Sequence, residues 1–188
     1  MAHAQEPGTK LVEVKRVQGA GKLALGLGLL LLVYGADQGT KRLVEETMVL
    51  GQTIPVIDGL LWWRYYLNPG AAFSMGEGST WIFTLISCLG ALVASGLLLR
   101  ARSLLWVLVL ALLTGGILGN LHDRLWRPPA FGLGHVVDFI SLPHFAIFNI
   151  ADAAICLSMG AAVLLTFLGY RLDGYRELKA EAGKEEEG

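Results

Sequence analysis

Two apolar runs decide the fold: residues 80–99 read TWIFTLISCLGALVASGLLL, and residues 103–121 read SLLWVLVLALLTGGILGNL. Neither run contains a charged residue. Each is close to the roughly 20 apolar residues that a helix needs to cross the hydrocarbon core of a bilayer. Both runs therefore predict membrane-spanning helices, with only a tight link between them.

Two further runs on either side complete the predicted scaffold. Residues 23–36 are apolar but short, and residues 17–21 add length because Lys22 can extend its ammonium group to the headgroups. The last run covers residues 153–170 and continues backwards through Asn149 and Asp152. We therefore predict an all-α membrane protein with four transmembrane helices, at about residues 19–36, 80–99, 103–121 and 149–170.

The composition agrees with a chain that lives in lipid. Hydrophobic residues make up 54% of the 188, the mean hydropathy is +0.54 and the net charge is −1, which argues against a soluble domain. The first span is followed by Asp37-Gln38-Gly39-Thr40-Lys41 and not by a small-residue cleavage site, so we interpret it as an uncleaved helix.

The positive charges predict the orientation. Ten of the 15 Lys and Arg flank the spans on one side, which places both termini in the cytoplasm. We divide the chain into an N-terminal tail (1–18), a membrane domain (19–172) and a C-terminal tail (173–188), with both tails solvated. The two cysteines, Cys88 and Cys156, lie within predicted spans, so we expect no disulfide and interpret them as small core residues.

The loops on the other side are long enough to hold a small β-rich subdomain. Residues 60–67 are aromatic and favour a strand, and the turn Asn68-Pro69-Gly70 follows them. The run 135–139 is a second extended segment. We expect a small extracytoplasmic sheet at the membrane surface, with Trp and Tyr side chains at the level of the headgroups.

Polar side chains gather at the outer ends of the predicted helices. An ionisable group beside a membrane span costs at least a few kcal/mol unless it is paired, so each is a candidate for function. Asp37 and Lys41 have the i, i+4 spacing of a helical ion pair, and Asp123 with the adjacent Arg124 could form another. The remaining members are Asn68, Asn120, Asn149, Asp138 and Asp152.

Asp138 and Asp152 carry the strongest chemical signal, because both lie in apolar surroundings. Two carboxylates brought together in such surroundings cannot both stay ionised, so one holds a proton while the other acts as a base. An aspartic protease uses that arrangement to activate water. The residues leave open whether Asp123 is the partner of Asp152, although Arg124 beside Asp123 favours Asp138. The nearby histidines show no metal-binding spacing, so we predict no metal site.

Five ordered motifs resemble the lipoprotein (type II) signal peptidases over about residues 22–170. They are Asp37-Gln38-Gly39-Thr40-Lys41, Asn68-Pro69-Gly70-Ala71-Ala72-Phe73, Gly119-Asn120-Leu121-His122-Asp123-Arg124, Val136-Val137-Asp138-Phe139 and Phe148-Asn149-Ile150-Ala151-Asp152. Each alone is weak, but the five in this order on a four-span scaffold are specific to the family.

The resemblance implies a membrane aspartic endopeptidase of the bacterial inner membrane. It would cleave diacylglyceryl-modified prolipoproteins before the lipidated cysteine, would need no cofactor and would be blocked by globomycin. The catalytic pair would be Asp138 and Asp152. Substrate-binding residues would be Asn68, Asn120, Arg124 and Asn149, and supporting residues would be Asp37, Lys41, Gly70 and Asp123.

Two other classes of protein compete with this interpretation. A small proton-coupled transporter could use paired aspartates as a proton relay, but it predicts carboxylates near the midplane and matching halves, which the sequence lacks. A scaffold subunit would use the same polar residues only to lock helices together. We expect a monomer that acts alone on its substrates in the membrane.

Overall fold

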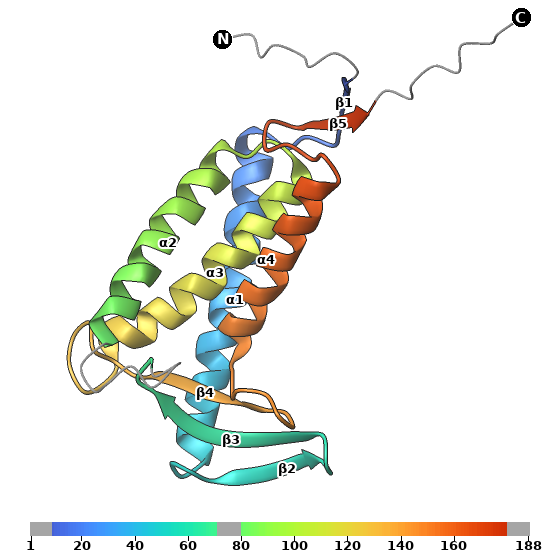
Figure 1. Ribbon diagram of the computed structural model, residues 1–188. Helices are drawn as coiled ribbons and strands as arrows, with labels where there is room; N and C mark the ends of the chain where they lie inside the picture. The colour runs from blue at the N-terminus through green and yellow to red at the C-terminus, as the bar shows by residue number, and fades with distance from the viewer. Residues whose placement is uncertain (1–8, 71–79, 180–188) are drawn as a thin grey trace, which may run out of the picture.

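The structure is a computed structural model that describes residues 9–70 and 80–179. Four helices form a bundle with a small sheet at each end (Figure 1). The helices are α1 (Gly19–Thr47), α2 (Thr80–Arg100), α3 (Leu104–Trp126) and α4 (Ile150–Phe167). All four are long and apolar enough to span a membrane, which confirms the predicted fold class.

Helix α3 lies at the centre of the bundle and packs against the other three helices. Its glycines allow this close packing. A Cβ atom on Gly115 would lie 2.8 Å from the carbonyl oxygen of Leu30 in α1, and one on Gly116 would lie 2.7 Å from that of Ala151 in α4. Small residues commonly allow membrane helices to approach each other in this way.

Helix α1 is longer than its predicted span, which ended near residue 36. It continues to Thr47 and projects beyond the bundle toward the sheet of β2, β3 and β4. The extension carries Val44 and Met48 into a buried apolar cluster with Val137 and Phe139 of that sheet. Burial of these side chains on the sheet stabilises the extra turns, because helical stability comes mostly from tertiary packing.

The predicted β-rich subdomain is a three-stranded antiparallel sheet in the order β2-β3-β4. Its strands are β2 (Thr53–Ile57), β3 (Leu61–Asn68) and β4 (Val136–Ser141). Tyr66 pairs with Asp138 and Asn68 pairs with Val136. This register places Asn68 and Asp138 diagonally across the two strands, within reach of each other on one face.

The segments predicted as solvated tails form structure at the opposite end of the bundle. Strand β1 (Thr9–Glu13) pairs antiparallel with β5 (Tyr175–Lys179), and we call this pair the terminal sheet. It lies at the end of the bundle away from β2–β4 (Figure 1). We did not predict this pairing from the sequence.

The cysteines do not have the surroundings that we predicted. Both are free thiols, as expected, but Cys156 is exposed on α4 and Cys88 is only half-buried on α2. The interpretation of both as small core residues is therefore wrong. Their helices pack mainly on α3, so the outer faces that carry them are available to lipid.

Candidate active site

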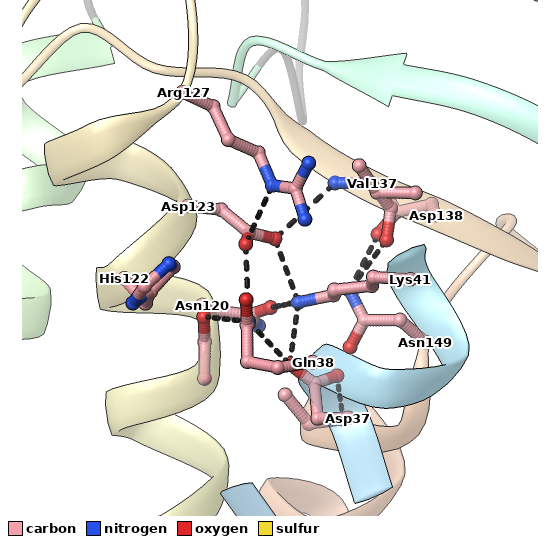
Figure 2. Close-up of polar contacts among 12 residues, drawn as sticks. Asp37, Gln38, Lys41, Asn120, His122, Asp123, Arg127, Val137, Asp138 and Asn149 are labelled. Atoms are coloured by element: carbon pink, nitrogen blue, oxygen red, sulfur yellow. Dashed lines mark hydrogen bonds and ion pairs between the residues drawn. The ribbon is translucent and has the colours of Figure 1, made fainter. Parts of the chain in front are cut away.

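A buried ammonium group is at the centre of the polar cluster beneath β4 (Figure 2). Lys41 Nζ lies 2.8 Å from Asp37 Oδ2 and 2.7 Å from Asp123 Oδ2, and all three side chains are fully buried. The helical ion pair predicted between Asp37 and Lys41 is confirmed. Asp37 also accepts a hydrogen bond from the backbone N–H of Ala151, which joins α1 to the start of α4.

Asp123 is neutralised by partners other than the one we predicted. Besides Lys41, it accepts a hydrogen bond from Arg127 Nε at 2.8 Å, and Arg127 also pairs with Glu45 of α1. The expected pairing of Asp123 with Arg124 is wrong. Adjacent residues on a helix point in different directions, whereas residues four apart lie on the same face.

Gln38, which lies in the first motif and was not predicted to have a role, is a member of this cluster. Its Nε2 donates at 3.1 Å to Asp37 Oδ2, Asp123 Oδ1 and the backbone oxygen of Gly119. Arg127 and Glu45 were also missed. The i+4 spacing of Arg127 from Asp123 was the available signal, whereas the pairing with Glu45 depends on tertiary structure.

Asn120 connects the buried ion pairs to Asp152. Its Oδ1 accepts hydrogen bonds from Lys41 Nζ at 3.0 Å and from Asn149 Nδ2 at 3.1 Å. Because both groups donate to the amide oxygen of Asn120, the orientation of its amide is fixed, and its Nδ2 points away from Lys41 and Asn149. It donates to Asp152 Oδ1 at 2.7 Å.

Asn149 links the two aspartates predicted to be catalytic. It is the N-cap of α4. Its Oδ1 accepts a hydrogen bond from the backbone N–H of Asp152, and Asp152 Oδ2 accepts one from the backbone N–H of Asn149. This reciprocal arrangement is a capping box. The Asn149 Nδ2 group donates to Asp138 Oδ1 at 2.7 Å. One residue therefore positions both carboxylates.

Asp138 lies on β4 and is 2% exposed. Its second oxygen, Oδ2, accepts from Asn68 Nδ2 at 2.9 Å, and Asn68 is held in turn by the backbone N–H of Gly70. Burial, reinforced by the nearby charge of Asp152, raises the pKa of Asp138 to about 7, against the lowering effect of the two amide donors. Asp138 can therefore hold a proton near neutral pH.

Asp152 opens onto a cleft of about 310 Å³ between α2, α3 and α4. The cleft walls are apolar and its polar end is formed by Asp152, Asn120 and Arg124. The guanidinium of Arg124 donates to the backbone oxygen of Asn120 at 3.3 Å, its only hydrogen bond to the described residues. The cleft lining is Ile86, Ser87, Gly90, Ile117, Asn120, Arg124, Asp152 and Ile155.

The site brings together all ten residues predicted from the motifs. Asp37, Lys41 and Asp123 form the buried ion cluster, Asn68, Asn120 and Asn149 contact the two aspartates, and Gly70 holds Asn68. Within residues 9–70 and 80–179, no three His, Cys, Asp or Glu side chains come close enough to bind a metal ion.

Comparisons with known proteins agree with this geometry. The family model described as signal peptidase (SPase) II matches residues 29–168. A lipoprotein signal peptidase of Leifsonia xyli is 48% identical over 166 residues, which cover 87% of this chain and 76% of that protein. One from Streptomyces coelicolor is 40% identical over 160 residues, covering 85% and 78%.

A solved structure has the same fold. It is described as a bacterial membrane enzyme at 1.9 Å resolution and is 27% identical, with a TM-score of 0.69, over 77% of this chain and 93% of that one. Nothing in these similarities supports a proton-coupled transporter. The chain belongs to the signal peptidase II family, and it is an aspartic protease that removes signal peptides from prolipoproteins.

Proposed function

We propose that Asp138 and Asp152 are the catalytic pair of this peptidase. The observation that carries the proposal is the contact of both aspartates with Asn149, whose side chain donates to Asp138 and accepts from the backbone N–H of Asp152. Asp152 accepts hydrogen bonds from Asn120 Nδ2 and from the backbone N–H of Asn149. Burial and the nearby charge of Asp152 raise the pKa of Asp138 to about 7, so Asp138 is suited to hold the proton of the pair.

The reaction follows from this division. Asp152 takes a proton from water, and the water oxygen attacks the carbonyl carbon of the scissile bond. Asp138 gives its proton to the carbonyl oxygen, which forms a neutral tetrahedral intermediate. Asp152 then protonates the leaving nitrogen, the carbon–nitrogen bond breaks, and Asp138 recovers a proton from the hydroxyl group.

The other polar residues divide into two roles in this proposal. The amide groups of Asn68, Asn120 and Asn149 are already engaged with the two aspartates and their supports, so they position the carboxylates. Arg124 has guanidinium donors to spare at the end of the cleft, and we assign it to hold a carbonyl oxygen of the substrate. Asp123 serves only to balance Lys41 and Arg127.

The substrate we propose is a diacylglyceryl-modified prolipoprotein that is cut before its lipidated cysteine. It enters sideways from the bilayer, through the cleft between α2 and α4, with its acyl chains in lipid. Globomycin competes for the same site, and the enzyme acts as a monomer. The aromatic segment 62–73 closes over the substrate in this proposal. Its residues 71–73 lie outside the described residues.

The proposed orientation places both termini in the cytoplasm and the site at the outer face. The excess of Lys and Arg on the terminal side supports it. Strands β1 and β5 lie at one end of the bundle and β4, which carries Asp138, lies at the other (Figure 1). An even number of spans places both ends of the bundle domain on the same side of the membrane.

Cleavage of a purified diacylglyceryl-modified prolipoprotein in detergent tests the assignment. Wild type is compared with Asp138→Asn, Asp152→Asn and Asp123→Asn, with chelator present and the folding of each variant checked by thermal unfolding. We expect folded but inactive protein for the first two variants. If Asp123→Asn were folded but inactive while Asp138→Asn remained active, Asp123 and not Asp138 would be the catalytic partner of Asp152.

A further inference from the structure

An apolar groove lies along the half of α4 that is remote from the active site. Its volume is about 370 Å³, and its lining is Met159, Ala162, Val163, Thr166 and Phe167. These residues recur at the spacing of one helical face. Phe167 is 85% exposed, so the groove faces the surroundings of the bundle and not its core. Its apolar lining suits an acyl chain.

A fixed arginine stands beside the end of this groove. Arg176 of β5 donates its Nε–H to the backbone oxygen of Leu168, the residue that follows Phe167. Its guanidinium carbon lies 4.7 Å from the centre of the Tyr170 ring. These two contacts hold the guanidinium in place and leave its terminal nitrogens without a hydrogen bond to any described residue. A guanidinium held in this way is preorganised to bind an anion.

The acidic residues at this end of the bundle are engaged elsewhere. Arg171 pairs with Asp173 and Glu177, and Glu13 pairs with Arg16. Within residues 9–70 and 80–179, Arg176 takes part in no ion pair. Its positive charge is therefore not neutralised by the described part of the chain.

The register of the terminal sheet places Lys10 and Arg176 on one face. Lys10 is opposite Leu178, and Val12 is opposite Arg176. Residues directly opposite each other share a face, and alternate residues along a strand share it too. One face therefore carries two cations and two apolar side chains, while Glu13 and Glu177 fall on the other.

The length of α4 places this face at the membrane surface. Its 18 residues rise about 27 Å, close to the roughly 30 Å thickness of the hydrocarbon core. With its first turn at the active-site end, Phe167 reaches the opposite boundary of the core. Tyr170 and Arg176 then lie among the headgroups, where Tyr and Arg side chains are favoured.

We propose that an anionic phospholipid binds here, with an acyl chain in the α4 groove and its phosphate on Arg176. Lys10, on the same face of the terminal sheet, adds to the positive charge that the headgroup meets. The site lies at the end of the bundle opposite the aspartates and does not depend on their assignment. Strands β1 and β5, which carry the headgroup part of the site, fall outside residues 29–168, which the family model matches.

Lipid titration of the purified protein tests the proposal. Thermal unfolding in neutral detergent is followed while dioleoyl phosphatidylglycerol, dioleoyl phosphatidylcholine or inorganic phosphate is added. We expect the phosphatidylglycerol to raise the unfolding temperature at the lowest concentration. Arg176→Gln should weaken its apparent affinity roughly fivefold, the effect of one basic residue at an anionic surface, and Arg176→Lys should restore most of it.

A matched control separates a site from general attraction to charge. Arg102→Gln removes the same charge from an exposed position in the link between α2 and α3, at the same end of the bundle. It should leave the affinity unchanged, whereas Ala162→Leu, which fills the groove, should lower it. Equal effects of the two lipids, equal effects of the two Gln variants, or the same stabilisation by inorganic phosphate would each overturn the proposal.

Discussion

Replacement of Asp138 by Asn should lower the stability of the protein more at low pH than at high pH, relative to wild type. The substitution removes the titratable group but keeps nearly the same shape. It also puts an amide NH₂ where one carboxylate oxygen accepts from Asn68 or Asn149, so one hydrogen bond is lost. That loss costs roughly 1–3 kcal/mol at every pH.

The pH-dependent part has a definite sign. The pKa of Asp138 is about 7 in the folded protein and 3.8 in an ordinary environment, so the folded state binds the proton more tightly. Protonation therefore stabilises the fold at low pH, and this stabilisation is lost as the pH rises toward 7. Between pH 5 and pH 8 the wild type should lose roughly 2–3 kcal/mol that the Asn variant does not lose.

Thermal unfolding in detergent at pH 5 and pH 8 measures this difference. For a chain of this length, roughly 2–3 kcal/mol corresponds to a midpoint shift of about 5–10 °C. The difference between the variant and wild-type midpoints should therefore change by that amount between pH 5 and pH 8. Asp58→Asn, at an exposed position between β2 and β3, serves as the control and should show no such change. If Asp138→Asn lowered the midpoint equally at both pH values, the carboxyl group would not be protonated in the fold and the proposed division of roles would fail.

Three further predictions concern the same site. Because the buried carboxyl with a pKa of about 7 supplies a proton, kcat/KM should fall up to tenfold per pH unit above pH 7, in a pH–rate profile on one lipidated substrate. Lys41→Met leaves two buried carboxylates without their ammonium partner, so it should lower the free energy of unfolding by roughly 3–5 kcal/mol, while the exposed Lys15→Met should not. Gly119→Ala would place a Cβ atom 2.5 Å from Asp37 Oδ2, so we expect a lower unfolding temperature and a loss of cleavage activity. Gly39→Ala is the control: its Cβ atom would meet no atom within 4 Å, so this variant should behave as wild type.

The membrane scaffold could be predicted because its signal is local. Unbroken apolar runs specify spanning helices without reference to the rest of the chain, and all four were found. The outer end of α1 was placed too early because Asp37 and Lys41 look like the end of a span. In the bundle they neutralise each other, and Val44 packs on the sheet, so the helix continues.

The pairings between distant segments could not be predicted. The terminal sheet joins residues more than 160 positions apart, and its strands carry no local pattern that names the partner. The partner of Asp123 was also misplaced, since adjacency in the sequence suggested Arg124 while the helix presents Arg127. The family motifs correctly collected the residues around the two aspartates, but their amide orientations come only from the tertiary structure.

Because Asn149 caps α4, the positions of Asp138 and Asp152 depend on the formation of this helix. The amide that starts α4 is also the group that joins Asp138 to Asp152. A newly synthesised copy whose last helix has not yet formed and docked therefore lacks an assembled pair of acids. With the proposed catalytic pair, peptide-bond cleavage therefore requires α4 to be formed and docked.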